Sequence, residues 1–183
     1  MQHPHFIDAD GSFTLDRPEE ISQLYFPLAS EAGLKSCVSP DLGGDAKLDQ
    51  ETFLLEPVSV ENLHNRSTRN FWLACADGTA FSLTGASAAQ QAAKFTPAQD
   101  DSRLTAGFMW HTLERTIPAA GVRATLTSFV PVQDNVEILS ITVENTSATT
   151  RRFTPYAAVP LYGRSADNLR DHRNVTSMLH RIR

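Results

Sequence analysis

A chain of 183 residues, 41% hydrophobic and 20% charged, is long enough to form one domain with a substantial core. Its formal net charge of −5 argues against a nucleic-acid partner and against a polybasic membrane anchor. No apolar run approaches the roughly 20 residues of a membrane span, and the N-terminus lacks the basic and apolar regions of a signal peptide. We therefore expect a cytoplasmic protein with no membrane partner. Its two cysteines, Cys37 and Cys75, fit buried thiols or at most one disulfide.

The first half of the chain carries two turn signals. Residues 40–45 hold two carboxylates beside two glycines, and a tight turn fits them better than a calcium loop because the oxygen ligands are too sparse. Further on, apolar runs at 70–76 and 79–83 flank the pair Asp77–Gly78. An Asp-Gly pair in this position predicts a β-hairpin with a type I′ turn.

The second half predicts strands over residues 104–117, 122–130, 136–145 and 152–161. The second of these alternates most clearly, because Val122, Ala124 and Leu126 share one face and Arg123 lies on the other. Pro155 cannot donate to a ladder and indicates an edge strand or a bulge. Residues 86–94 are rich in helix formers but short, and a helix competes there with a strand edge or a loop.

Strands joined by short turns, with almost no helical pattern, predict an all-β fold, an antiparallel β-sandwich. No nucleophile elbow, phosphate-binding loop or dinucleotide fingerprint is present. We assign no catalytic residue, no metal ligand and no cofactor. The paired His3 and His5 are better explained as a terminal segment than as a metal site.

One polar segment follows the last predicted strand, and residues 164–183 carry a net charge of +3 against −5 for the whole chain. Planar guanidinium, amide and carboxylate groups match the vicinal hydroxyls of a sugar and the oxygens of a phosphate. A surface brace for another domain is the alternative. The candidate substrate-binding residues are Arg164, Asn168, Arg170, Asp171, His172 and Arg173.

Several stretches resemble the start of glycoside phosphorylases of the cellobiose phosphorylase and β-1,2-oligoglucan phosphorylase family, and similar modules occur in cyclic β-1,2-glucan synthases. The resemblance runs from about residue 15 to the end and is closest to the β-1,2-oligoglucan branch. The stretches that carry it are 24–34 (LYFPLASEAGL), 39–45 (SPDLGGD), 52–60 (TFLLEPVSV), 65–72 (NRSTRNFW), 106–111 (AGFMWH), 127–132 (TSFVPV) and 160–173 (PLYGRSADNLRDHR).

The resemblance implies an N-terminal β-sandwich of the mutarotase-like supersandwich type, followed in the family by a catalytic (α/α)6 barrel. We expect an N-terminal arm over residues 1–14 and a truncated sandwich over 15–183, with the barrel absent. The implied parent reaction is inverting phosphorolysis of a β-glucoside or oligoglucan, with inorganic phosphate as co-substrate and α-glucose 1-phosphate as product. The resemblance also implies a homo-oligomer, and this chain alone should be inactive.

Two other classes of function stay open. A stand-alone carbohydrate-binding module would need aromatic side chains exposed on one sheet face, and Phe71, Trp72, Phe108 and Trp110 are the candidates, although each fits a core position better. A mutarotase-like enzyme would need an acid and a base in one cleft, for which His172 could pair with Asp167 or Glu144.

Overall fold

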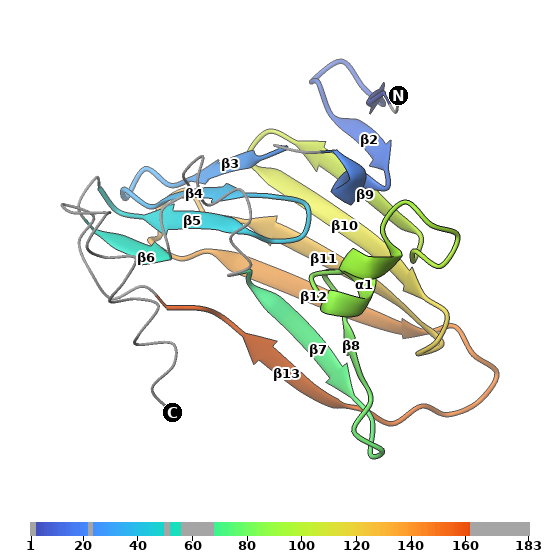
Figure 1. The fold of residues 1–183 in the computed structure, drawn as a ribbon. Coiled ribbons are helices and arrows are strands. Elements are labelled where there is room, and N and C mark those ends of the chain that lie inside the picture. Colours follow the sequence, from blue (N-terminus) through green and yellow to red (C-terminus); the bar gives the residue numbers. More distant parts are fainter. Residues whose placement is uncertain (1–2, 22–23, 50–51, 56–67, 162–183) are drawn as a thin grey trace.

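The computed structural model describes residues 3–21, 24–49, 52–55 and 68–161. Its regular structure is nearly all β and forms three antiparallel sheets: a six-stranded sheet in the order β1-β2-β9-β10-β11-β12, a four-stranded sheet β3-β4-β5-β6 and a three-stranded sheet β13-β7-β8 (Figure 1). The expected all-β antiparallel sandwich is thereby confirmed. Within these ranges no helix is long and apolar enough to cross a membrane.

The long strands of the fold lie in the six-stranded sheet. Its members are β1 (His5–Phe6), β2 (Phe13–Asp16), β9 (Ser102–Gly107), β10 (Trp110–Ile117), β11 (Val122–Phe129) and β12 (Ile138–Asn145). The boundary expected between an arm and the sandwich at residue 15 falls inside β2, and both β1 and β2 pair within this sheet.

The two smaller sheets complete the sandwich. The four-stranded sheet consists of β3 (Phe26–Ala29), β4 (Lys35–Val38), β5 (Gly44–Lys47) and β6 (Phe53–Leu55). The three-stranded sheet consists of β7 (Asn70–Ala74), β8 (Ala80–Ser82) and β13 (Thr154–Ala158). The helical elements are the short 3-10 helix η1 (Pro18–Glu20) and α1 (Ala88–Ala93).

One apolar cluster joins all three sheets. Alternation places one face of β11 inside the sandwich, so that Val122, Ala124 and Leu126 are buried while Arg123 is exposed, as the sequence pattern predicts. These side chains meet apolar residues of the two smaller sheets. The buried members of the cluster are Leu28, Leu34, Val38, Leu42, Leu73, Leu83, Ile117, Ala120, Val122, Ala124, Leu126 and Val130.

The hairpin at Asp77–Gly78 is confirmed, but its expected turn type is wrong. Gly78 has a φ of 85°, whereas Asp77 is not among the residues with positive φ. The amide of Gly78 donates to the carbonyl of Cys75 (3.1 Å) and the amide of Cys75 donates to that of Thr79 (2.8 Å). This pattern is a three-residue loop with a type I turn and one left-handed residue, and it needs positive φ at a single position.

The same three-residue loop joins β4 to β5 and confirms the tight turn at residues 40–45. Here the left-handed position is occupied by Leu42, with a φ of 63°. A leucine is strained in this conformation. Its side chain is fully buried in the core cluster, so burial of an apolar side chain offsets the backbone strain.

The single strand expected over residues 104–117 is wrong, because the chain reverses in the middle. Strands β9 and β10 pair with each other, with Gly107 opposite Trp110. Phe108 and Met109 form the tip, and Met109 has a φ of 62°. Neither residue is a typical turn former, which is why alternation alone suggested one continuous strand.

The remaining local expectations have clear outcomes. Residues 86–94 contain the helix α1, whose first turn is capped by Ser87 accepting a hydrogen bond from the amide of Gln90 (3.1 Å). Strand β13 pairs only with β7, so Pro155 lies on a sheet edge within the described ranges. Cys37 and Cys75 are free and half-buried.

Candidate functional site

The sequence-predicted binding segment lies outside the residues that the structure describes. This holds for all six candidates: Arg164, Asn168, Arg170, Asp171, His172 and Arg173. Of the alternative acid–base pair, His172 and Asp167 also fall outside. Glu144 lies on β12 with its carboxylate 3.4 Å from the guanidinium of Arg123, and both side chains are exposed. It therefore forms a surface ion pair.

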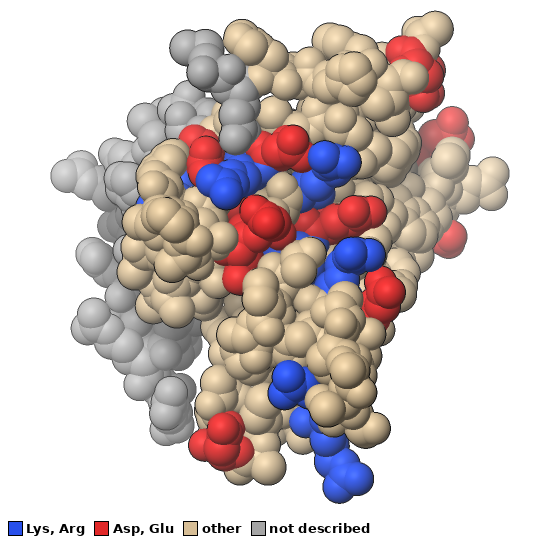
Figure 2. All heavy atoms as spheres, turned by 90° about the vertical axis from the view of Figure 1, so that its right-hand side faces the viewer, with Lys and Arg blue, Asp and Glu red and all other residues tan. Residues whose placement is uncertain are grey.

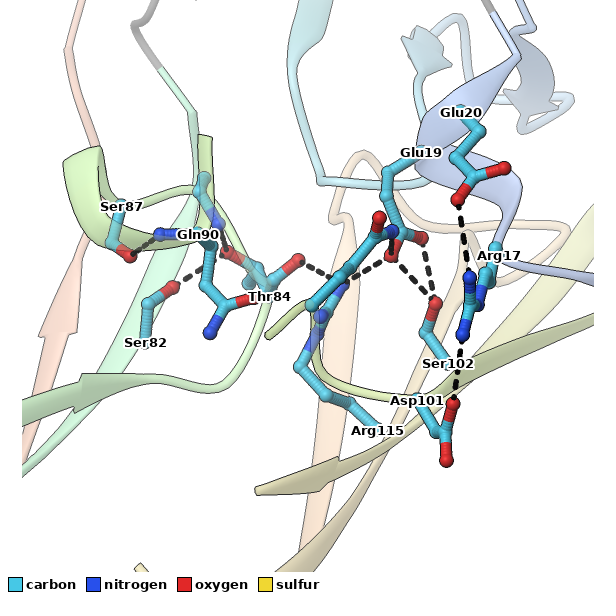
Figure 3. Close-up of polar contacts among 12 residues, drawn as sticks. Arg17, Glu19, Glu20, Ser82, Thr84, Ser87, Gln90, Asp101, Ser102 and Arg115 are labelled. Carbon is cyan, nitrogen blue, oxygen red and sulfur yellow. Dashed lines mark hydrogen bonds and ion pairs between the residues drawn. The ribbon is translucent and has the colours of Figure 1, made fainter. Parts of the chain in front are cut away.

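A buried ion pair lies at the inner face of the six-stranded sheet (Figure 3). Arg115 on β10 is only 2% exposed, and its Nη2 lies 3.5 Å from Oε1 of Glu19 in η1. Glu19 also accepts hydrogen bonds from the hydroxyl of Ser102 (2.7 and 2.8 Å) and from the amide of Gln99 (2.8 Å). Burial would raise the pKa of Glu19, but Arg115 and these donors hold it below its usual value.

Gly85 gives Arg115 the space it needs. The glycine has a φ of 82°, and a Cβ atom there would collide with the guanidinium group. Arg115 Nη2 also lies within hydrogen-bond distance of the carbonyl of Thr84 (3.5 Å). Arg115 thus ties β10 to η1 and to the loop before α1, and Glu19 extends the link to Ser102 of β9. These contacts are those of a structural brace.

A second buried ion pair lies between β5 and the start of β12. Arg69 and Glu137 form a bidentate pair, in which Arg69 Nη2 donates to Oε2 over 2.8 Å. Nη2 of Arg69 also donates to the hydroxyl of Ser36 (3.0 Å) and to the carbonyl of Asp45 (3.1 Å). This pair fastens the four-stranded sheet to the six-stranded sheet.

His111 lies close to this second pair and is fully buried on β10. Its ring stacks on Phe26 with a centroid distance of 4.9 Å. Neither ring nitrogen has a hydrogen-bond partner among the described residues. Burial, with a smaller contribution from the positive charge of Arg69, lowers the pKa of His111 to about 4. The imidazole is therefore neutral at physiological pH.

Sequence reasoning missed both ion pairs, although a signal was available for the pair of Arg115. Arg115 and His111 stand at positions of β10 that alternation assigns to the buried face, beside Leu113 and Ile117. A charged or polar residue on such a face needs a buried partner. The partners Glu19 and Glu137 are far away in sequence and carry no comparable signal.

The outer face of the six-stranded sheet is polar and carries both signs of charge. Arg103 on β9 lies between Asp16 on β2 and Glu114 on β10, and its Nε is 2.8 Å from the Asp16 carboxylate. Figure 2, which views the molecule from the right-hand side of Figure 1, shows acidic and basic side chains next to one another near the centre. Here an open depression of about 470 Å³ is lined by Asp16, Arg17, Asp101, Ser102, Arg103, Glu114, Thr116 and Arg123.

Two further rows of side chains cross the same outer face. A hydroxyl row runs over five strands through residues that face one another in register: Thr14, Thr105, Thr112, Thr127 and Ser140. The next row begins at Gly107 and continues through Trp110, Phe129 and Ile138. Trp110 and Phe129 are half-buried, and Phe108 at the hairpin tip is 85% exposed.

The four aromatic candidates thus have different environments. Phe71 packs against the apolar core, as expected, and Trp72 is half-buried opposite Tyr156 of β13. Phe108 is exposed, so a core position is wrong for it, and Trp110 lies on the outer face of the sheet. Within the described ranges, no group of three or more His, Cys, Asp or Glu side chains is placed to hold a metal ion.

The fold is that of a β-sandwich domain in which the buried charged groups support the packing of the sheets. Comparison with protein families matches residues 78–182 to the supersandwich domain of glycosyl hydrolase 94. The chain belongs to this family. A search of curated proteins finds no match. The match extends over β8 to β13 and includes the polar segment 164–173. It confirms the coarser part of the resemblance, and the particular branch stays a prediction.

Proposed function

We propose that this chain is the sandwich domain of an inverting glycoside phosphorylase that acts on β-linked glucosides, of the β-1,2-oligoglucan or cellobiose type. The observation that carries the proposal is the family match over residues 78–182, on a fold with the antiparallel sandwich that the family name describes. The resemblance of residues 24–72, which precede this range, to the same phosphorylases supports it further. Inorganic phosphate is the second substrate in this proposal.

We propose that the catalytic acid belongs to another part of the protein. An inverting hydrolase needs one carboxylic acid to protonate the leaving oxygen and one carboxylate to activate water. Phosphate is already an anion, so a phosphorylase needs only the acid. The buried carboxylates described here, Glu19 and Glu137, are both neutralised by arginines. They are suited to holding the sandwich together, and we assign neither of them to the reaction.

We propose that residues 164–173 contact the acceptor sugar or phosphate in the complete enzyme. The support is the density of guanidinium, amide and imidazole groups in this segment and its place inside the matched range. The change Arg170→Ala in the complete enzyme should then raise KM for one of the two substrates by roughly tenfold to a hundredfold, because a charge-assisted hydrogen bond is lost.

The control for this experiment is the melting temperature of the same variant. A brace against the barrel would lower the melting temperature and leave KM unchanged. Unchanged kinetics together with unchanged stability would remove the segment from the functional site. Arg152→Ala is a matched variant, since Arg152 is an exposed arginine outside residues 164–173; it should change neither quantity appreciably.

The proposal as a whole is tested by a product assay. The protein encoded by the complete reading frame, incubated with phosphate and either sophorose or cellobiose, should release glucose 1-phosphate, and the preferred disaccharide identifies the branch. The 183-residue chain should release none. Turnover by the 183-residue chain, proportional to its concentration, would contradict the assignment of the acid to another part of the protein.

A further inference from the structure

We propose that the outer face of the six-stranded sheet is a binding surface for a β-linked glucan chain, formed by residues other than 164–173. The choice of glucan rests on the proposed function, whereas the surface itself is defined by the structure. Three rows of side chains make it up: the apolar row with Trp110 and Phe129, the hydroxyl row of Thr14, Thr105, Thr112, Thr127 and Ser140, and the charged depression around Arg103.

The indole of Trp110 lies against the sheet at Gly107. A Cβ at Gly107 would be 2.6 Å from Nε1 and 2.7 Å from Cε2 of Trp110, and 2.9 Å from the hydroxyl of Ser12. These nearly equal distances show that the ring covers the glycine, and Ser12 is buried beside it. Glycine within a strand commonly marks such a close approach. The indole is thereby held in place with part of its surface open to solvent.

The rows beside Trp110 supply the polar contacts that a sugar needs. The hydroxyls of Thr112 and Thr127 lie 2.9 Å apart on neighbouring strands, and each can donate and accept. Rows on one face of a strand are about 7 Å apart. From Trp110 to the row of Arg103 and Glu114 is therefore about 14 Å, long enough for an oligosaccharide rather than a single sugar.

Positive and negative charges are equal in number in the depression, so a neutral ligand fits it better than a charged one. Three carboxylates (Asp16, Asp101 and Glu114) face three guanidinium groups (Arg17, Arg103 and Arg123). A polyanion or a polycation would meet as much repulsion as attraction there. A neutral polyhydroxyl chain can hydrogen-bond to both kinds of group, and its apolar ring faces can stack on the indole.

The exposed tip of the β9–β10 hairpin is a further indication of a binding role. Met109 has a φ of 62°, which is strained for a side chain of this size. Phe108 beside it is 85% exposed. Strained backbone at an exposed aromatic tip is common at binding sites, and this tip directly adjoins Trp110.

The chain offers a direct test, because Trp72 and Trp110 are its two tryptophans. In the Trp72→Phe chain, all indole emission comes from Trp110. Titration with linear β-1,2-linked glucan oligosaccharides should give a saturable change in this emission. The matched Trp110→Phe chain, which keeps Trp72 on another sheet, should show no change. A response in Trp110→Phe equal to that in Trp72→Phe, or none in either, overturns the proposal.

If a tryptophan variant fails to fold, the glucan affinity of further variants, measured by calorimetry, tests the same surface. Thr112→Val preserves shape and should weaken binding about three- to tenfold. Gly107→Ala places a Cβ where the indole lies and should abolish binding, whereas Gly78→Ala, with open space around it, should bind normally. Equal affinity in Thr112→Val, Gly107→Ala and the unmodified chain contradicts the proposal.

The two proposals fail independently. Glucan binding by the 183-residue chain without phosphorolysis by the complete protein would remove the proposed function and leave a glucan-binding domain. Phosphorolysis without an emission change in the Trp72→Phe chain would overturn the surface alone. Binding of α-1,4-linked but not β-linked oligosaccharides would also overturn it.

Discussion

Both faces of the six-stranded sheet carry an arginine paired with a carboxylate, but the pair on the inner face is buried and the pair on the outer face is exposed. On the inner face, Arg115 is buried and held by the carboxylate of Glu19, which also accepts a hydrogen bond from Ser102, and by the carbonyl of Thr84. On the outer face, Arg103 pairs with Asp16 while both side chains remain exposed. Both arginines lie on neighbouring strands of one hairpin. The comparison shows that burial, not the presence of an ion pair, decides whether a charge holds the fold or stays available to a ligand.

The largest difference between the faces should appear when each arginine is removed. Arg115→Ala leaves the Glu19 carboxylate buried without its cation, and we expect a loss of about 3–5 kcal/mol in the free energy of unfolding. Arg103→Ala removes an exposed pair worth about 0–1 kcal/mol. Denaturant unfolding of both variants measures the difference. Equal losses would show that the inner pair is not the brace that its burial indicates.

The pH dependence of stability should separate His111 from the carboxylates. Its pKa falls from 6.5 to about 4 on folding, so the unfolded chain takes up the proton first. The contribution of the neutral His111 to the free energy of unfolding is therefore fully present above pH 6.5. It is lost as the pH falls toward 4, by about 3 kcal/mol in total. In the His111→Phe variant, the free energy of unfolding should change less between pH 6.5 and 4.

Glu19 acts in a lower pH window, which serves as the internal control. Its folded pKa lies below the usual value, so its contribution is present above its unfolded pKa, near 4.5, and is lost as the pH falls through the folded pKa. Urea unfolding at a series of pH values measures both windows. If the free energy of unfolding varies with pH between 6.5 and 4.5 in the same way with and without the His111 change, His111 is not a buried neutral imidazole.

Two glycines give a smaller but closely matched comparison. Gly85 and Gly78 have nearly the same φ, 82° and 85°, but Gly85 lies against the guanidinium of Arg115 and Gly78 has nothing within 4 Å. Alanine at Gly78 should cost about 1 kcal/mol, from backbone strain alone. Alanine at Gly85 should cost about 1–3 kcal/mol more, because Arg115 must move. Thermal unfolding of the two variants measures the difference, and equal melting temperatures would contradict the role of Gly85.

Much of the sheet structure could be predicted from the sequence because it is local. Alternation over residues 122–130 correctly identified the buried face of β11, and the Asp-Gly pair located the β7–β8 hairpin. The reversal at Phe108 and Met109 could not be predicted, because neither residue is a typical turn former. The ion pairs of Arg115 and Arg69 join residues far apart in the sequence. Only the placement of Arg115 on a buried face could hint at its pair, and Arg69, which precedes β7, carries no such signal.

Only the kind of ligand, and not the geometry of the candidate site, could be predicted from the sequence. The polar composition of residues 164–173 suggested sugar or phosphate binding, and the family match now covers this segment. The outer-face surface could not be predicted, because its rows form only when five strands come into register. Trp110 in particular is indistinguishable from a core residue until Gly107 is seen beneath it.

The most direct test of the account is the anomeric configuration of the product, measured by phosphorus and proton nuclear magnetic resonance. The protein encoded by the complete reading frame is incubated with a β-linked disaccharide and inorganic phosphate, and the anomeric signals of the sugar phosphate are recorded. We expect α-glucose 1-phosphate, formed by one inverting displacement and only in the presence of phosphate. Formation of the β anomer, or of free glucose alone at a rate independent of phosphate, would contradict it.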